Sequence, residues 1–217
     1  MNIFELRQNI SREIIDYNLL MSALSSYAHA RGKISEWLHK GELIRVKKGL
    51  YVFGPQASRN PYSIENLANL IYGPSAISLH YALNFYGLIP ERVHSVTSIT
   101  NKRNKQFTTP VGEFTYQYLH PKKYAIGIDI MTSSPNSSYF IATPEKALCD
   151  LIALTTKNIS LESTHEFENF VFEDLRLDNI EFGKLNRERF QEIARVYANQ
   201  RLNKFTNLLL KWKFKNA

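Results

Sequence analysis

The sequence predicts an α+β protein in which a small N-terminal unit precedes a larger, mixed α/β unit. Three observations predict this class: helical periodicity in the first 40 residues, a short alternating hairpin after it, and mixed helix and strand patterns beyond a turn-rich segment. A chain of 217 residues is long enough for one large domain or two small ones. We therefore expect domains at residues 1–54 and 60–217.

The N-terminal unit is expected to contain helices at residues 3–17, 18–27 and 31–40. In the third helix the apolar residues share one face, and the opposite face is polar and includes Ser35 and His39. The segment 43–53 then alternates apolar and basic residues, and Gly49 supplies the positive φ angle of a tight turn. Helix, turn, helix and basic hairpin together predict a winged helix-turn-helix.

The second unit is predicted to follow a linker at residues 54–61. Asn60 and Pro61 resemble a helix start, and Ser78 is a candidate cap for a second helix that stops at Gly87. Strands are expected at residues 93–101, 113–119 and 138–142, and another helix after Thr143. The tail predicts one or two amphipathic helices, whose apolar stripe is Phe190, Ile193, Tyr197, Phe205, Leu208, Leu209 and Trp212.

The composition is that of a globular protein, with 44% hydrophobic and 22% charged residues. The apolar runs are far shorter than the ~18–20 residues that cross a bilayer, so we expect no contact with a membrane. No basic stretch followed by an apolar one begins the chain, and a secretory signal is not expected. A single cysteine, Cys149, allows no internal disulfide, which favours a cytoplasmic location.

The net charge is +7 and the pI is near 9.4, which favours a polyanionic partner without identifying it. The charge is also segmented, because residues 162–181 hold seven acidic residues against one basic, and residues 184–215 hold nine basic against two acidic. The strong apolar stripe of the tail favours packing of this basic segment inside the protein over binding to an external polyanion or to lipid.

The motifs of common enzymes are missing from the sequence. It has neither a glycine-rich phosphate loop nor a Gly-x-Ser-x-Gly elbow, and no glutamate precedes a lysine by two positions. None of the six histidines has a second histidine three to five residues away, as a helical metal site requires. Cys149 is expected to be a core side chain. The sequence therefore predicts no catalytic residues, no metal and no cofactor.

The predicted third helix and hairpin have the residue types that bind duplex DNA, because a helix fits the major groove and cations contact the phosphates. We expect Ser35 and His39 at base edges, with His29 and Arg31 at the start of the helix. Backbone contacts are expected from Lys33, Lys40, Arg45, Lys47 and Lys48. Two alternatives remain open: a small α+β module with solvated lysines, and a winged helix that binds a protein.

Four short blocks occur in one order along residues 18–152: IRVKKGLY at 44–51, ISLHYALNFYGLIPE at 77–91, VTSITNKR at 96–103 and ATPEKALCDL at 142–151. Together they resemble the AbiEi antitoxin family. The resemblance implies a transcriptional regulator that is the antitoxin of a type IV toxin–antitoxin system linked to phage abortive infection. In that family the winged helix represses its own operon, and the larger domain counters a nucleotidyltransferase-like toxin without a stable complex.

The resemblance implies two partners, the double-stranded DNA of its own operator and the toxin. Its DNA-facing positions correspond to Arg31, Lys33, Ser35, His39, Lys40, Arg45, Lys47 and Lys48. The alternative function is a protein-interaction module that neutralises a toxin by direct contact, without DNA binding. A polar, basic segment at residues 100–106 adds a possible second nucleic-acid contact at Lys102, Arg103 and Lys105, although an exposed hairpin end explains it equally well.

Overall fold

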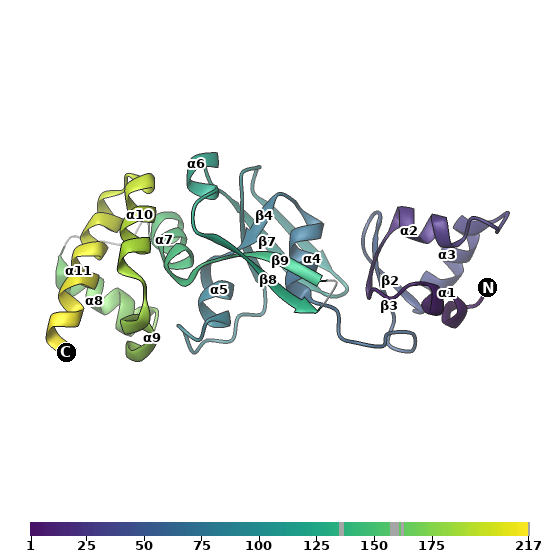
Figure 1. Ribbon diagram of the computed structural model, residues 1–217, viewed down its shortest axis with the longest axis horizontal. Coiled ribbons are helices and arrows are strands. Elements are labelled where there is room, and N and C mark those ends of the chain that lie inside the picture. The colour runs from purple at the N-terminus through teal and green to yellow at the C-terminus, as the bar shows by residue number, and fades with distance from the viewer. Residues whose placement is uncertain (135–136, 157–160, 162, 217) are drawn as a thin grey trace.

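The computed structural model describes residues 1–134, 137–156, 161 and 163–216. The molecule is elongated, with the N-terminal unit at one end, a six-stranded sheet in the middle and a layer of helices at the other end (Figure 1). The two termini lie at opposite ends. In the described ranges, helices combine with a three-stranded and a six-stranded sheet, which confirms the α+β class.

The N-terminal unit consists, in order, of α1 (Ile3–Asn9), β1 (Ile14–Asp16), α2 (Tyr17–Ala23), α3 (Ala30–His39), β2 (Leu43–Lys47) and β3 (Leu50–Phe53). Its strands pair antiparallel in the order β1-β3-β2. A small core forms between the helices and one face of this sheet, from side chains such as Leu20, Trp37 and Phe53. The turn between β2 and β3 contains Gly49 at φ +85°, as the sequence predicts.

The prediction of one helix over residues 3–17 is wrong beyond Asn9, where α1 ends. Residues 14–16 form β1 instead, and Ile14 pairs with Val52 of β3. Because this partner strand comes much later in the chain, local periodicity gives no sign of the pairing. The other two expected helices exist: α2 is shorter than expected, and α3 begins and ends one residue earlier than expected.

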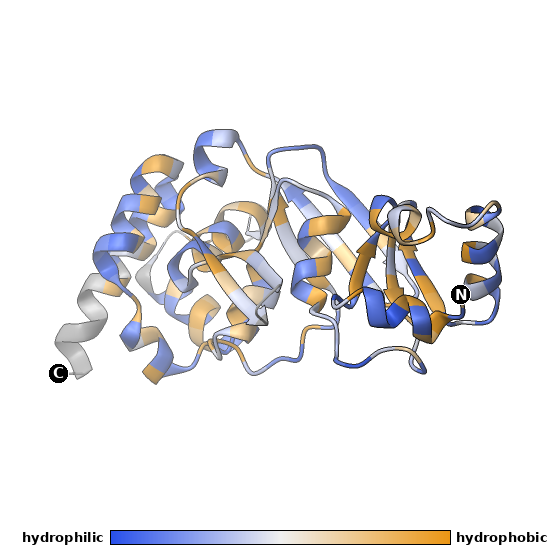
Figure 2. Ribbon diagram, turned by 45° about the vertical axis from the view of Figure 1, so that its right-hand side comes forward, coloured by the Kyte–Doolittle hydropathy of each residue, from blue (hydrophilic) through white to orange (hydrophobic). Residues whose placement is uncertain are grey.

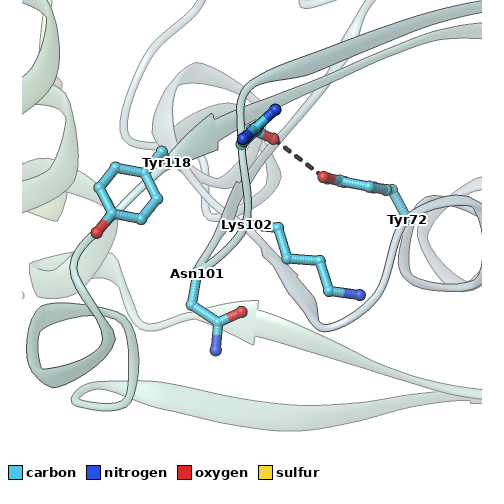
Figure 3. Close-up of a pocket in the computed structure, with 5 residues that line it drawn as sticks. Tyr72, Asn101, Lys102 and Tyr118 are labelled. Atoms are coloured by element: carbon cyan, nitrogen blue, oxygen red, sulfur yellow. Dashed lines mark hydrogen bonds between the residues drawn. The ribbon is translucent and has the colours of Figure 1, made fainter.

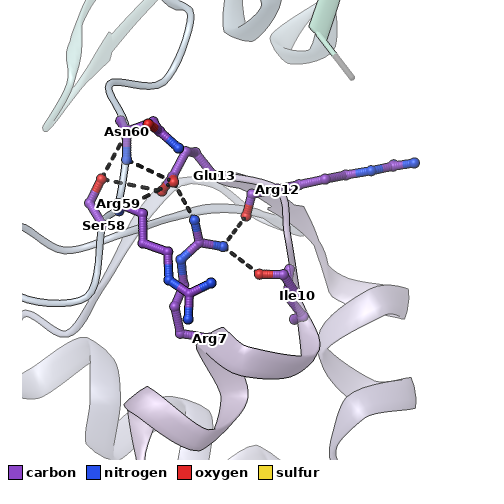
Figure 4. A network of polar contacts seen from close by, with 7 residues as sticks. All are labelled: Arg7, Ile10, Arg12, Glu13, Ser58, Arg59 and Asn60. Atoms are coloured by element: carbon purple, nitrogen blue, oxygen red, sulfur yellow. Dashed lines mark hydrogen bonds and ion pairs between the residues drawn. The ribbon is translucent and has the colours of Figure 1, made fainter. Parts of the chain in front are cut away.

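The segment 54–61 is fixed against the N-terminal unit by a buried ion pair (Figure 4). The Arg7 guanidinium lies 4.7 Å from the Phe53 ring centroid, donates to two backbone carbonyls and pairs with Glu13. The Glu13 carboxylate in turn accepts from the backbone N–H of Arg59 at 3.3 Å and from that of Asn60 at 3.0 Å. The expected linker is therefore an ordered connection.

The second unit is built on a sheet with the strand order β6-β7-β5-β4-β9-β8. Its strands are β4 (Ser75–Ile77), β5 (Val96–Thr100), β6 (Lys105–Thr109), β7 (Gly112–Tyr118), β8 (Ile128–Ser134) and β9 (Ser137–Ala142). β5 pairs parallel with β7, and β4 parallel with β9, whereas the other neighbours are antiparallel. The sequence predicts β5, β7 and β9 but misses β4, β6 and β8.

Helices cover this sheet and form the layer beyond it. They are α4 (Ile64–Ile71), α5 (Leu79–Phe85), α6 (Pro121–Tyr124), α7 (Pro144–Thr155), α8 (Thr164–Asn169), the π-helix η1 (Phe170–Asp174), α9 (Asn179–Lys184), α10 (Arg187–Tyr197) and α11 (Gln200–Asn216). Hydrophilic and hydrophobic residues alternate along the helices, as amphipathic packing requires (Figure 2). None of the described helices is both long and apolar enough to span a membrane.

Helix starts in this unit agree only partly with the sequence. α7 begins after Thr143, whose side chain accepts from the backbone N–H of Lys146, which confirms the predicted start. The start expected at Pro61 is wrong, because α4 begins at Ile64 and Ser63 caps it. α5 does follow Ser78, yet the Ser78 hydroxyl does not cap the helix.

The tail helices pack through their predicted apolar stripe. Phe190, Ile193, Tyr197, Phe205 and Leu209 are all buried, whereas Leu208 and Trp212 lie outside the described side chains. The Phe205 ring centroid lies 6.0 Å from that of Phe167, in the acidic segment 162–181, and 6.0 Å from that of Phe182, which directly follows this segment. Aromatic packing therefore joins the two oppositely charged segments, of which Glu162 lies outside the described residues.

A polar network is buried where α7 meets α5, α6 and α10. The Lys146 ammonium lies 2.6 Å from the Asp150 carboxylate and donates to the backbone carbonyl of Lys123 at 2.9 Å. Asp150 also accepts from the Ser78 hydroxyl at 2.6 Å, and the Tyr197 hydroxyl contacts both Lys146 and Asp150. Burial lowers the pKa of Lys146 and raises that of Tyr197. Four elements thus share one set of hydrogen bonds.

Candidate nucleic-acid interface

The outer face of α3 is open to solvent. Ala30, Ile34 and Trp37 are buried in the small core, and their spacing fixes the rotation of the helix. The opposite face therefore presents Ser35 and His39, with Arg31 and Lys40 at its two margins; all four are exposed, and the sequence assigns all four to DNA contact. His29 is exposed at the N-cap position and makes no side-chain capping bond there.

One residue of this face that sequence reasoning missed is Tyr17, at the start of α2. Its hydroxyl accepts from Nε of Arg31 at 3.1 Å, which restrains the guanidinium beside the first turn of α3. Tyr17 precedes Arg31 by 14 positions, so the spacing of residues on α3 carries no signal of this contact. Only the packing of α2 against α3 brings the two side chains together.

Two of the predicted phosphate contacts are already paired. Lys33 and Lys40 each place their ammonium 2.7 Å from the Glu36 carboxylate, from opposite sides along α3. Their hydrogen bonds lower the pKa of Glu36 to about 2, and the bond to Glu36 raises the pKa of Lys40. The trio carries one net positive charge, so Glu36 reduces the positive potential of this face.

The hairpin presents Arg45 and Lys48 to solvent. Arg45 lies opposite Tyr51 of β3, and its guanidinium is 5.9 Å from that ring centroid, which orients the side chain along the sheet. Lys48 is exposed in the turn beside Gly49. Both cations are therefore open to solvent on the hairpin.

Lys47 does not join them, which corrects the sequence assignment. Its half-buried ammonium donates to the backbone carbonyls of Leu70 and Ile71 at the end of α4, at 3.0 and 2.5 Å, and burial lowers its pKa. The cause is a β-bulge, because the pairing of β2 with β3 shifts by one residue between Arg45 and Lys47. Lys47 is thereby paired with Leu50, on the face that packs against the second unit.

The hairpin is covered on both faces, because side chains alternate between the two faces of a strand. Tyr51 and Phe53 face the small core, whereas Val46, Leu50 and Val52 belong to the large core of the second unit. The N-terminal unit is thus seated on the rest of the protein through the hairpin, and α3 lies away from that contact (Figure 1).

The second predicted set lies on the loop between β5 and β6. Arg103 and Lys105 are exposed, whereas the Lys102 ammonium donates to the backbone carbonyl of Gly73 at 2.6 Å. The Lys102 ammonium also lies 5.7 Å from the ring centroid of Tyr72. Lys102 and Arg103 line a hollow together with Tyr72, Asn101 and Tyr118. Asn101 and Tyr118 were not among the site residues predicted from the sequence.

Elsewhere, the described residues include one cysteine, Cys149, which is buried. Among them no three His, Cys, Asp or Glu side chains gather as a metal site requires. Cys149 is buried on α7, and burial raises the pKa of its thiol well above the usual value, which makes it a poor nucleophile.

Comparison of the sequence with models of known protein families gives no match, and comparison with curated proteins gives no significant similarity. The geometry described above is therefore the basis for a functional proposal, together with the four ordered sequence blocks.

Proposed function

We propose that the N-terminal unit is a winged helix-turn-helix that binds duplex DNA, with α3 as the recognition helix and the β2-β3 hairpin as the wing. The element order α1-β1-α2-α3-β2-β3 supports the assignment. The observation that carries the proposal is the solvent-open outer face of α3, where Ser35 and His39 lie between Arg31 on one margin and Lys40 on the other, with none of the described elements over them. A helix presented in this way fits a major groove.

In this proposal Ser35 and His39 face base edges, and Arg31, Lys40, Arg45 and Lys48 contact phosphates on both sides of the groove. Lys33 contributes less, because it is half-buried and pairs with Glu36. Lys47 instead secures the wing to α4. The function proposed for the whole chain is repression of its own operon and antitoxin activity against a nucleotidyltransferase-like toxin, which the resemblance to the AbiEi family supports.

The DNA-binding proposal is tested by fluorescence anisotropy on the DNA upstream of the chain's own gene, over a series of salt concentrations. Wild-type protein should bind this DNA more tightly than random duplex of equal length, with affinity that falls steeply as salt rises. Each phosphate contact removed should reduce the slope of log K against log salt by about 0.9. We expect this reduction for Lys48→Glu and for Lys40→Glu.

Lys184→Glu is the matched control. Lys184 is exposed on α9 and pairs with Glu181 at 2.6 Å, as Lys40 pairs with Glu36, but it lies far from α3. Its replacement should leave the slope unchanged. Equal affinity for upstream and random DNA at every salt concentration would refute the proposal.

The antitoxin activity is tested separately, by co-expression with the product of a neighbouring nucleotidyltransferase-like reading frame. Growth should be restored by wild-type protein and also by Lys40→Glu, since repression and neutralisation are assigned to different units. Co-purification of the two proteins after nuclease treatment would favour neutralisation by direct contact instead.

A further inference from the structure

Two loops meet at one edge of the six-stranded sheet. β5 and β7 run parallel, and Thr100, the last residue of β5, is paired with Tyr118, the last residue of β7. The segments that follow, residues 101–104 and 119–120, therefore leave the sheet side by side. The carboxyl ends of parallel strands are the usual place for a ligand site, because loops converge there on a rigid scaffold.

These loops and the first residues of β6 and α6 that follow them are together rich in cations and contain no carboxylate. Residues 101–106 read NKRNKQ and residues 119–124 read LHPKKY, which gives five lysines and arginines and no acidic residue. Within the described part of the chain, none of the ion pairs involves Arg103, Lys105 or Lys122. The edge thus carries positive charge that the protein itself does not neutralise, which suits an anionic ligand.

A hollow of about 510 Å³ lies at this edge, lined by Tyr72, Asn101, Lys102, Arg103 and Tyr118. Tyr118 stands on one side of the loop and Tyr72 on the other, with Asn101 and Lys102 between them (Figure 3). Tyr118, the last residue of β7, is 47% exposed. Its ring is therefore available as a flat surface for a ligand.

The hollow is held in place before any ligand arrives. The Tyr72 hydroxyl donates to the backbone carbonyl of Arg103 at 3.2 Å, and Lys102 is fixed to the carbonyl of Gly73. The backbone N–H of Tyr118 donates to Oδ1 of Asn104 at 2.6 Å, which ties the loop 101–104 to the end of β7. A site fixed in advance loses little entropy on binding.

We propose that this hollow binds single-stranded nucleic acid, with Tyr118 stacking on an unpaired base. The Arg103 guanidinium contacts the adjacent phosphate, and the Asn101 amide is placed to bond a base edge. Aromatic rings that alternate with cations are the usual means of binding a single strand, since every base has a face that can stack. Duplex DNA is a poor ligand here, because its bases are already stacked on one another. This site is separate from α3 and does not depend on the proposed repressor function.

The test uses the full chain and fluorescence anisotropy with labelled 12-nucleotide RNA and DNA of mixed sequence. Tyr118→Ala should weaken binding of the single strands about ten-fold, the usual loss of one stacked base. Tyr118→Phe should bind as tightly as wild-type protein, since the ring is kept. Phe140→Ala is the matched control, because Phe140 is 48% exposed on β9 of the same sheet and lies outside the hollow; it should have no effect.

Arg103→Ala tests the proposed contact between the Arg103 guanidinium and a phosphate. It should reduce the slope of log K against log salt by about 0.7, the value for one phosphate contact on a single strand. Preference for RNA over DNA, or the reverse, then identifies the natural strand.

The proposal is overturned if wild-type protein binds neither oligonucleotide, if Tyr118→Ala binds single strands as tightly as wild-type protein, or if Tyr118→Ala weakens duplex binding equally. The last outcome would make the hollow an extension of the duplex site. Lys40→Glu should weaken duplex binding alone, so that failure of one proposal is distinguishable from failure of the other.

Discussion

A lysine and a carboxylate one helical turn apart occur on both α3 and α7, and the two pairs have opposite surroundings. On α3, Glu36 and Lys40 are 2.7 Å apart with exposed fractions of 40% and 54%. On α7, Lys146 and Asp150 are 2.6 Å apart and fully buried. The sequence spacing and the distance are therefore nearly the same, and only burial differs.

This difference decides what each pair does. Water screens the pair on α3, so it contributes little to folding and acts mainly by setting the charge that α3 presents to a ligand. The pair on α7 is shielded from solvent, and its charges are stabilised by each other, by the backbone carbonyl of Lys123 and by the hydroxyls of Ser78 and Tyr197. The first pair adjusts a surface, whereas the second holds four elements together.

The largest expected effect comes from Lys146→Met. The substitution leaves the Asp150 carboxylate buried without its counter-charge, which costs about 3–5 kcal/mol in other proteins. Urea denaturation followed by circular dichroism measures the free energy of unfolding. Lys40→Met is the matched change on α3, and it should leave the midpoint of urea denaturation unchanged within error. Similar midpoints for the two variants would contradict the comparison.

A smaller effect is expected from Tyr197→Phe, which removes the hydroxyl that contacts Lys146 and Asp150. A buried donor or acceptor that is left without its hydrogen-bond partner costs about 1–3 kcal/mol of the free energy of unfolding. Tyr116→Phe is the control, since the Tyr116 hydroxyl donates to the neutral carbonyl of Ala68 at 2.6 Å, and its loss should cost less. Thermal or urea unfolding measures the free energy of unfolding of both variants. A larger loss of this free energy for Tyr116→Phe than for Tyr197→Phe would count against a cooperative network.

The smallest effect on stability is expected from Glu36→Gln, and here the change is in binding. The pKa of Glu36 is about 2, so the carboxylate stays ionised at any pH used for binding, and substitution is needed to remove its charge. Lys33 and Lys40 are then released, and duplex DNA should bind several-fold more tightly at low salt. Anisotropy measures this, with Glu181→Gln on α9 as the control. Unchanged or weaker binding would place α3 away from the phosphates.

Local sequence signals predict those features of the fold that depend on neighbouring residues. The polar face of α3 follows from the 3.6-residue period, and the start of α7 follows from the cap at Thr143. β1 and β4 are three residues long and depend on strands far away in the sequence, so they escape a local pattern. The helix start at Pro61 fails because Ser63, three residues from Asn66, is the better placed cap.

The candidate site follows the same rule. The exposure of Ser35 and His39 on the face of α3 away from the core follows from helical spacing alone. The position of Lys47 does not follow from spacing, because a single bulge residue in β2 turns it to the other face of the hairpin. The pairing of Thr100 with Tyr118 is likewise invisible in the sequence, and it is what brings the ring of Tyr118 beside the basic loop.

The end of α4 receives one lysine from each basic surface: Lys47 from the hairpin, at the carbonyls of Leu70 and Ile71, and Lys102 from the sheet edge, at that of Gly73. The hairpin cannot tilt without withdrawing an ammonium from two carbonyls. Both surfaces are therefore held to the same segment at the end of α4. This shared attachment, and not the length of the connecting chain, sets the distance between them.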